Sequence, residues 1–267
     1  METKYETILV SRSGPLATVA LNRPANRNSI GGPMMRELYA AIGAIASDPS
    51  VRVMVLRGEG ADFCPGADVK HHGADPAKSD ARPERPGWSS TAEFNISVML
   101  HEMPAVTIAA IRGACAGAGF GWACACDLRI ASETARFNNA FLDVGVAGDM
   151  GGPWTLPRIV GAAKARELCF FPGKFAAGDA LRIGLVSRVT PDDAFDAELK
   201  TLTDRLTRAA PLALQTLKAN FLAAEKMGFA DYIALESEKH VRLFQSEDTT
   251  EAFRAYVEKR PPVFRGR

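Results

Sequence analysis

The stretch from Ala105 to Asp127, AVTIAAIRGACAGAGFGWACACD, holds the residues whose order best predicts a chemical site. It begins with a continuous apolar run rich in β-branched residues, which is typical of a fully buried strand. Glycines then recur at alternate positions, Gly117, Gly119 and Gly121, and a small apolar segment with the make-up of a buried helix follows. This order places the first amides of a helix, which lack intrahelical acceptors and lie at the positive end of its dipole, at the mouth of a pocket. Such amides bind an anion, or an oxygen that becomes one during a reaction.

Three other interpretations compete for the same stretch. A membrane span is disfavoured because Arg112 falls inside it, at a cost of roughly 2.5–3.5 kcal/mol at mid-bilayer, and because no basic flank follows. A dinucleotide-binding loop needs the pattern G-x-G-x-x-G, which is not met because Trp122 directly follows the third glycine. Close packing of a helix on a strand also uses glycine. From these residues alone, close packing and an anion or oxyanion site both stay open.

A second turn of similar make-up follows another apolar strand. The segment Asp62-Phe-Cys-Pro-Gly-Ala-Asp68 comes after the run Val51–Leu56, and its Gly66-Ala67 pair is able to present a further backbone amide. Two amides that converge on one carbonyl oxygen form an oxyanion hole, in which each donor is typically worth ~3–4 kcal/mol of transition-state stabilisation. The spacing along the chain does not show whether the two turns converge.

Asp149 lies in a third glycine-rich segment, Val146-Ala-Gly-Asp-Met-Gly-Gly152, just before a predicted helix. An aspartate in this setting is commonly a turn or capping residue, and from the residues alone that interpretation is favoured over a catalytic one. Metal ligation is not expected, because Cys124-x-Cys126 lacks a second Cys or His pair at zinc spacing. The pair His71-His72 is better interpreted as part of a solvated loop.

The composition predicts an ordinary globular protein. The chain has 267 residues, 47% of them hydrophobic and 24% charged, which is enough apolar material for a large core. A formal charge of +1 argues against a surface for nucleic acid or membranes that depends on bulk charge. The odd number of cysteines, mostly in apolar contexts, and the absence of a signal-peptide pattern lead us to expect reduced thiols and a cytoplasmic location.

The elements that must position these residues alternate between strands and helices, which predicts the α/β class. The hydrophobic patterns predict strands at 6–10, 15–21, 51–56, 105–111, 128–131, 135–138 and 186–189. They predict helices at 33–48, 90–101, from 153 onward, and near 192–208, 212–227, 231–245 and 248–258. We also expect a Ser13-Gly14 hairpin turn and a shared face for Phe94, Val98 and His101. The charged, proline-rich segment His71–Gly87 is predicted to be a mobile loop or lid.

Three motifs together resemble the crotonase (enoyl-CoA hydratase/isomerase) superfamily. They are Phe63-Cys-Pro-Gly-Ala-Asp68, Gly113-Ala-Cys-Ala-Gly-Ala-Gly119 and Cys126-Asp127-Leu-Arg-Ile-Ala131. The resemblance runs from the Asn22-Arg-Pro24 loop to Glu258-Lys-Arg260 and so covers nearly the whole chain. It implies a spiral of repeated ββα units over residues 1–190, followed by a C-terminal helical section over 191–267 that assembles homotrimers or hexamers.

The resemblance also implies a substrate and the residues that bind it. The substrate is an acyl-CoA thioester, so coenzyme A enters as part of the substrate and no cofactor stays permanently bound. Matched by position, the amides that hold the thioester oxygen are those of Ala67 and Ala118. Arg23, Lys70 and Lys259 are candidates for the CoA phosphates. The other expected substrate-binding residues are Asp68, Phe141 and Tyr256, and Tyr256 and Lys259 are expected to reach the site of a neighbouring subunit.

Two departures from the family pattern bear on the reaction. Family hydratases carry glutamates at the positions that match Gly121 and Phe141, and neither of these residues can transfer a proton. Asp149 matches the proton-transfer aspartate of dienoyl-CoA isomerases and of epoxide (oxepin-forming) isomerases, and also the nucleophile of aroyl-CoA dehalogenases. The resemblance therefore favours an isomerase in which Asp149 shifts a proton while two amides hold the enolate oxygen.

Two alternatives stay open beside that function. One is other crotonase chemistry on an acyl-CoA, namely C–C hydrolysis or nucleophilic displacement by Asp149. The other is a non-catalytic acyl-CoA binder. If Phe141, Val144, Val146, Phe120 and Trp154 wall the site, desolvation is expected to raise the pKa of Asp149.

Overall fold

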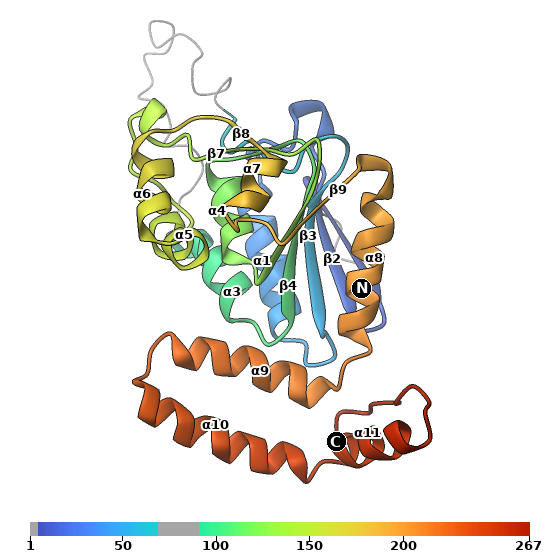
Figure 1. The fold of residues 1–267 in the computed structure, drawn as a ribbon. Helices are drawn as coiled ribbons and strands as arrows, with labels where there is room; N and C mark the ends of the chain where they lie inside the picture. Colours follow the sequence, from blue (N-terminus) through green and yellow to red (C-terminus); the bar gives the residue numbers. More distant parts are fainter. Residues whose placement is uncertain (1–4, 69–90) are drawn as a thin grey trace, which may run out of the picture.

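The computed structural model describes residues 5–68 and 91–267, and a six-stranded sheet runs through their centre (Figure 1). The sheet has the order β1-β2-β3-β4-β6-β9, in which β1 and β2 are antiparallel and every later pair is parallel. Its strands are β1 (Ile8–Ser13), β2 (Leu16–Leu21), β3 (Val53–Gly58), β4 (Val106–Ile111), β6 (Leu128–Ser132) and β9 (Arg188–Thr190). The α/β class expected from the sequence is confirmed.

Helices cover both faces of this sheet, which explains why its central strands are apolar throughout. On one face, Val53, Ile108 and Ile130 pack against α8 (Phe195–Thr207) through its buried Phe195 and Leu199. On the other face lie α1 (Met34–Ala46), α3 (Ile96–Glu102) and α4 (Ala118–Ala125), which share the larger core. The 3-10 helix η3 (Thr91–Asn95) leads into α3.

A second, smaller sheet gives the chain its repeating unit. Its order is β5-β7-β8, formed by β5 (Ala114–Ala116), β7 (Arg136–Asn138) and β8 (Phe175–Ala176). Twice the chain runs from a strand of the large sheet to a strand of the small sheet and then to a helix, as β4-β5-α4 and as β6-β7-α5. This is the ββα spiral that the resemblance implies.

The remaining helices flank the sheets or form the C-terminal section (Figure 1). Beside the small sheet lie α5 (Gly152–Val160), α6 (Ala162–Phe170) and α7 (Ala177–Arg182). The chain ends with α9 (Pro211–Ala224), α10 (Phe229–Phe244) and α11 (Glu247–Val257), which lie below the sheet in this view. Lys218 of α9 donates to the carbonyl of Ala105 at 2.8 Å and to Asp127 Oδ2 at 2.7 Å, so α9 is attached where β4 and β6 begin.

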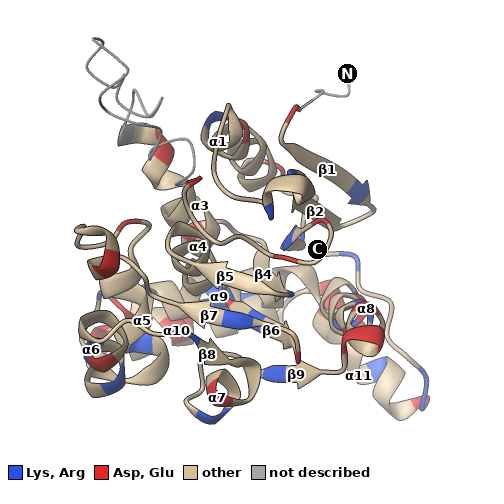
Figure 2. Cartoon of the chain, turned by 90° about the horizontal axis from the view of Figure 1, so that it is seen from above, with Lys and Arg blue, Asp and Glu red and all other residues tan. Residues whose placement is uncertain are grey.

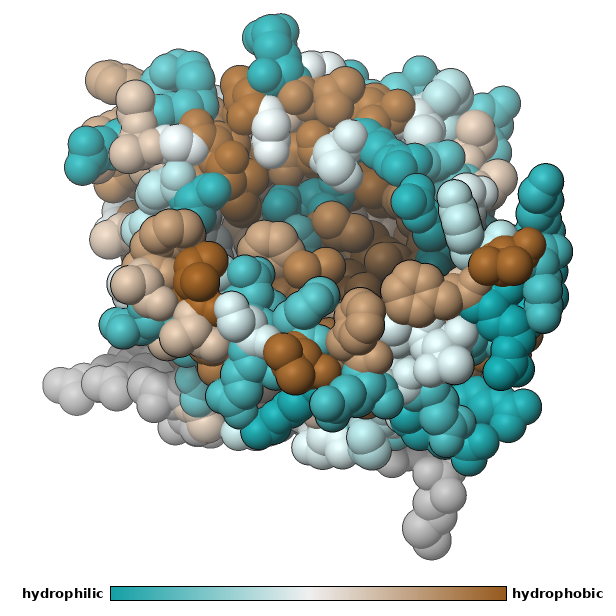
Figure 3. All heavy atoms as spheres, turned by 60° about the horizontal axis from the view of Figure 1, so that its bottom comes forward, coloured by the Kyte–Doolittle hydropathy of each residue, from teal (hydrophilic) through white to brown (hydrophobic). Residues whose placement is uncertain are grey.

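The C-terminal helices leave a hydrophobic surface uncovered. Figure 3 shows the lower face of the molecule, which is hollowed and has hydrophobic residues gathered around the hollow. The most exposed large apolar side chains of α9, α10 and α11 are Leu217, Phe221, Phe229, Val241, Phe244, Phe253, Tyr256 and Val257. The division at residues 190 and 191 and the assembly into trimers or hexamers stay predictions.

Some expected details of the elements are wrong. The hairpin turn lies at Gly14-Pro15 and not at Ser13-Gly14, because β1 extends through Ser13 and pairs it with Leu16. Val98, expected on one face with Phe94 and His101, is 49% exposed, and the residues that α3 buries are Ile96, Ser97 and Leu100. The short strand β5 was hidden within the glycine-rich run, where three residues give too little alternation to detect.

Charged residues lie mainly on the outer helices and strand edges, while β5 and α4 carry none (Figure 2). Within residues 5–68 and 91–267, no helix combines the length and the apolar character that a membrane crossing requires.

Candidate active site

Of the two glycine-rich turns in chain order, the first is Asp62–Asp68 and the second leads into α4 at Gly117. They lie next to each other because the first turn pairs with the small sheet. Cys64 forms a parallel bridge with Cys115 of β5, through Cys64 N–H to the Ala114 carbonyl at 2.8 Å and Ala116 N–H to the Cys64 carbonyl at 2.9 Å. Counted three residues further along both segments, this register reaches Ala67 and Ala118. The two turns, whose relative position the sequence left open, therefore lie side by side.

Glycine allows the two backbones to approach closely at this point. A Cβ atom added to Gly66 would lie 3.2 Å from the Ala116 carbonyl oxygen, and one added to Gly117 would lie 3.6 Å from Gly66 Cα. Gly117 also has φ 53° and ψ −128°, a conformation that is unfavourable for residues with a side chain. The glycine at 117 thus meets a conformational requirement of the turn, and Gly66 meets a steric one.

Each turn leaves one backbone amide available. Ile30 bonds to Gly66 and Asp68 on either side of Ala67, so the Ala67 amide points away from that partner. Ala118 begins α4, and its N–H, like those of the first residues of any helix, has no intrahelical acceptor. Among the described residues, neither amide donates to a protein group. Two aligned amides of this kind are able to hold one oxygen that carries negative charge.

Asp149 lies in the chain that follows β7, the second strand of the same small sheet. Phe137 of β7 pairs with Cys115 of β5, so the chain that leaves β7 emerges at the edge where both turns lie. The segment around Asp149 packs on α4: a Cβ atom added to Gly121 would lie 2.6 Å from Met150 Cβ and 3.4 Å from the Asp149 carbonyl oxygen. The sequence alone favoured a capping role for Asp149, but its side chain does not cap α5, whose N-cap residue is Gly151.

The Asp149 carboxyl group is partly removed from water. Its Oδ1 atom is buried and has no hydrogen-bond partner among the described residues. Burial raises its pKa from 3.8 to about 6, as expected for a carboxylate moved out of water. The carboxylate also lies near Cys64 of the first turn, where burial, despite a hydrogen bond from Gly66, raises the pKa of the thiol to about 12. The site therefore combines two free amides with one desolvated carboxylate, which suits proton transfer near neutral pH.

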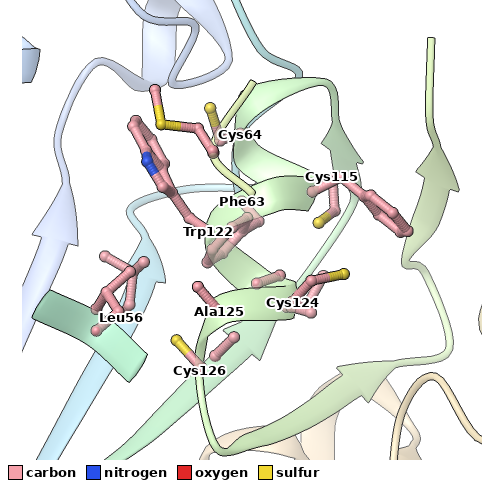
Figure 4. Close-up of a cluster of buried hydrophobic side chains, with 14 of the residues drawn as sticks. Leu56, Phe63, Cys64, Cys115, Trp122, Cys124, Ala125 and Cys126 are labelled. Atoms are coloured by element: carbon pink, nitrogen blue, oxygen red, sulfur yellow. The ribbon is translucent and has the colours of Figure 1, made fainter. Parts of the chain in front are cut away.

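Three of the apolar residues near Asp149 in the sequence are exposed in the single chain. Val144, Val146 and Trp154 are 63%, 50% and 42% exposed. Trp154 contacts the edge of His101, with ring centroids 5.1 Å apart, and the Arg158 guanidinium lies 3.8 Å from its ring centroid. Helix α4, which begins at the second turn, is enclosed in a buried hydrophobic cluster (Figure 4). That figure shows α4 with apolar and thiol side chains on several sides, among them Leu56, Phe63, Cys64, Cys115, Trp122, Cys124, Ala125 and Cys126.

Phe120 and Phe141 occupy different parts of this region. Phe120 is buried against Phe137, with ring centroids 6.4 Å apart, in the core beneath the site. Phe141 is half-buried, and its ring comes within 3.7 Å of the position that a Cβ atom on Gly148 would take. Phe141 therefore packs on the segment that carries Asp149.

Arg23 lies beside the first turn and contacts Asp68, the last residue of that turn. Arg23 Nη2 lies 3.4 Å from Asp68 Oδ2, and Arg23 Nη1 donates to the Ser29 carbonyl at 2.6 Å. Asp68 is 6% exposed, and its amide donates to the Ile30 carbonyl at 3.1 Å. This pair holds the loop that precedes α1 against the turn that carries Ala67.

The other predicted binding residues are not gathered within one chain. Tyr256 is 84% exposed on α11, and Lys259 is exposed just beyond it. Helix α11 lies below the sheet in Figure 1, whereas the two turns lie beyond the opposite ends of the strands. Lys70, together with His71 and His72, lies outside the described residues.

Sequence reasoning missed a polar group that supports the first turn. The Asp62 carboxylate accepts hydrogen bonds from Arg27 Nε at 2.7 Å and from the Ala114 amide at 2.6 Å, which ties the turn to β5. Although burial acts to raise it, these bonds hold the pKa of Asp62 below its ordinary value. Asn28, which is fully buried, donates to the carbonyls of Glu59 and Asp62 at 2.8 and 2.7 Å. The signal was the polar Asn22–Ser29 loop, whose partners lie more than 30 residues away.

The sequence did not lead us to expect metal binding. The part of the chain that the structure describes contains no cluster of three or more His, Cys, Asp or Glu side chains able to hold a metal ion. Cys124 and Cys126 are buried, and burial raises the pKa of each thiol to about 12, so both stay protonated.

Known proteins are similar to this chain in sequence and in architecture. Residues 11–267 match the family model described as enoyl-CoA hydratase/isomerase. The chain is 31% identical to the 2,3-dehydroadipyl-CoA hydratase of Escherichia coli, over 97% of this chain and 99% of the relative. It is 30% identical to the short-chain-enoyl-CoA hydratase of Clostridium acetobutylicum, over 96% and 97%. A crystal structure of an enoyl-CoA hydratase from Polaromonas sp. JS666 superimposes with a TM-score of 0.85 at 30% identity, covering 97% of this chain and 99% of that one.

The family match spans both motif-bearing turns, the Asp149 segment and the C-terminal helices, and the structural match covers the same architecture. The crotonase-type fold that the resemblance implied is thereby confirmed. The chain is an enzyme of the enoyl-CoA hydratase/isomerase family.

Proposed function

We propose that this enzyme moves a proton within an acyl-CoA thioester and so shifts a double bond. The Asp149 carboxylate removes a proton from a carbon conjugated with the thioester, and the electron pair passes to the thioester oxygen as an enolate. The Ala67 and Ala118 amides hold that oxygen, because negative charge gathers there in the transition state. The protonated Asp149 then returns the proton at a different carbon, so the reaction needs no other reactant.

The observation that carries this proposal is the buried, unpartnered Oδ1 atom of Asp149 at the edge where the two turns lie. A carboxylate with a pKa of about 6 is ionised at neutral pH, and it is a stronger base than an ordinary aspartate. Gly121 and Phe141, which stand where the family hydratases carry glutamates, offer no group that transfers a proton.

A second candidate function is hydration of an enoyl-CoA, and the names of the relatives favour it. Hydration requires one group to activate water and another to deliver a proton at Cα. Asp149 is able to serve as one of these groups, and the second would have to come from another residue or from water. The chemistry of the described site therefore supports proton transfer better than hydration.

Binding of the CoA part is proposed on charge and on assembly. Arg23, next to the first turn, and Lys70 are the candidates for the phosphates within one chain. We propose a homotrimer or hexamer in which Tyr256 and Lys259 reach the site of a neighbouring subunit, since both are exposed on or just after α11. Coenzyme A acts as part of the substrate, and neither a nucleic acid nor a permanently bound cofactor is expected.

The test compares wild type with Asp149→Asn in deuterium oxide. A panel of β,γ-enoyl, α,β-enoyl and dienoyl CoA esters is incubated with each protein, and products are identified by mass and by double-bond position. Calorimetry with acetoacetyl-CoA measures binding separately. We expect deuterium incorporation and double-bond movement in wild type, and loss of both in Asp149→Asn with unchanged affinity. Asp143→Asn serves as the matched control, because Asp143 is an exposed carboxylate in the preceding 3-10 helix η4 (Leu142–Val144).

Each alternative gives a different result. Water addition without a double-bond shift indicates hydration, and a covalent adduct on Asp149 during turnover indicates displacement. Binding without exchange of any ester indicates a non-catalytic acyl-CoA binder. An Asp149→Asn variant that exchanges as fast as wild type overturns the proposed role of Asp149.

A further inference from the structure

Gly121 lies where helix α4 supports the segment that carries Asp149. Its amide donates to the Gly117 carbonyl at 3.0 Å, so it belongs to the first turn of the helix. A Cβ atom at this position would lie 2.6 Å from Met150 Cβ. Two carbon atoms cannot approach so closely, because their optimal separation is about 3.5–4.0 Å. Both atoms are attached directly to the main chain, so no side-chain rotation relieves the contact.

Met150 is held in an unusual conformation against this glycine. Its φ of 49° lies in the left-handed region, which a residue with a side chain seldom adopts. Gly148 and Gly151, on either side of the Asp149-Met150 pair, have φ of 121° and 75°, so the chain bends sharply here. Met150 is only 3% exposed. The burial of Met150 against α4 is therefore what keeps this bent segment in place.

We propose that Gly121 is a positioning residue for Asp149. The missing side chain at 121 makes the space that Met150 occupies, and Met150 in turn fixes the carboxylate of the preceding residue beside the two amides. A side chain at position 121 and Met150 in its present position exclude each other for steric reasons. This inference deepens the proposed function and rests on it for the catalytic importance of Asp149.

A Gly121→Ala substitution distinguishes this role from ordinary packing. Alanine is the better helix former, so a glycine without a special role in α4 would tolerate the change or gain stability from it. If the contact with Met150 matters, the segment moves outward and Asp149 becomes hydrated. The pKa of Asp149 then falls from about 6 toward 3.8. Turnover falls while KM stays nearly constant, and a displacement of about 1 Å typically costs ~10²-fold in rate.

The experiment uses the full chain and reads the Asp149 carboxyl directly. Aspartate is labelled with ¹³C at the carboxyl carbon, and the Asp149 signal is assigned by its loss in Asp149→Asn. Its pH titration and deuterium exchange into the best acyl-CoA of the panel are measured in Gly121→Ala, Met150→Ala, Met150→Gly and the two double variants. Met150→Ala and Met150→Gly both remove the thioether chain, but only the glycine removes the Cβ atom that meets position 121.

The expected result is a selective rescue. Relative to Met150→Gly alone, adding Gly121→Ala should leave the Asp149 titration and the exchange rate nearly unchanged. Relative to Met150→Ala alone, the same addition should lower the pKa of Asp149 and the exchange rate, because the two Cβ atoms still meet. Gly43→Ala in α1 is the control, since its Cβ atom would meet only Met99 Sδ at 3.6 Å. If Gly121→Ala does not fold, the solubility of the two double variants tests the same contact. A soluble Gly121→Ala/Met150→Gly protein and an insoluble Gly121→Ala/Met150→Ala protein support it.

Equal effects of Gly121→Ala in both Met150 backgrounds would overturn the positioning role, as would a Gly121→Ala variant with wild-type titration and wild-type turnover. Because the titration does not require turnover, it separates this inference from the proposed function. An inactive Asp149→Asn variant beside a normal Gly121→Ala variant refutes only the positioning role. An active Asp149→Asn variant refutes the proposed reaction. The contact between positions 121 and 150 is then still tested by the titration.

Discussion

Replacing Asp149 with asparagine is expected to stabilise the folded protein at pH 8.5, and to do so much less at pH 4.5. The folded protein binds the Asp149 proton more tightly than the unfolded chain does, because burial disfavours the charged carboxylate. Stability that depends on this group is therefore lost as the pH rises from about 4 to about 6. Asparagine carries no charge at either pH, so the variant avoids this loss while retaining the capacity to form the turn.

The size of the effect follows from the position of the carboxyl group. Its pKa lies about two pH units above the ordinary value of 3.8, and each unit corresponds to about 1.4 kcal/mol, which gives a ceiling of roughly 3 kcal/mol. Asp149 is only half-buried, so solvent screening reduces this to about 1–2 kcal/mol. For a chain somewhat longer than 250 residues, that is roughly 2–6 °C in Tm.

The measurement is the Tm and the free energy of unfolding in urea at pH 4.5, 6.0, 7.0 and 8.5. It compares wild type with Asp149→Asn and with the exposed control Asp143→Asn. The difference between Asp149→Asn and wild type should grow with pH and level off above about pH 7, whereas that for Asp143→Asn should not follow this curve. A difference that stays flat with pH, or that favours wild type increasingly as the pH rises, would refute the argument that Asp149 is desolvated.

Three further predictions concern the turns, the C-terminal helices and the reaction. Gly117→Ala should destabilise the protein by about 1–3 kcal/mol in urea unfolding and reduce exchange activity, while Gly145→Ala, which has open space around it, should spare activity. Lys218→Met should cost about 3 kcal/mol, because it leaves Asp127 without its buried cation. The exposed Lys200→Met should cost less than about 1 kcal/mol in the same urea titration. Crotonyl-CoA hydration, followed by loss of enoyl absorbance, should be ~10²–10⁴-fold slower than in a relative with both glutamates, because acid–base assistance is missing; equal rates would mean that other residues supply it.

The local elements of the site were predictable from the sequence. The apolar run before Gly113 and the small apolar residues after Gly117 predicted the strand β4 and the helix α4, because these patterns are encoded within a few adjacent residues. The Asp62–Asp68 turn was recognised on the same basis, and the family resemblance then assigned the two amides and Asp149. The three-residue strand β5 was missed, because such a short segment shows no periodicity.

The surroundings of Asp149 were not predictable in the same way. Trp154 and Val146 are close to Asp149 along the chain, yet Trp154 faces His101 and Val146 is half exposed. Met150, which directly follows Asp149, is buried against Gly121 of α4 instead. The direction of a side chain in a bent loop depends on its φ and ψ angles and on what packs above it, and neither is encoded in apolar character alone.

The sequence by itself determined which functional groups are present. These are two turns with a free amide each and one carboxylate among glycines, in a chain of the α/β class. Hydrogen bonding and glycine conformation act over a few residues, so a single stretch specifies them. The tertiary structure decided how these groups meet. The bridge between Cys64 and Cys115 places the two turns side by side, and Gly121 packs against Met150, the residue that follows Asp149. Both depend on residues about 30 to 50 positions apart, whose pairing is fixed only when the sheets and α4 pack together.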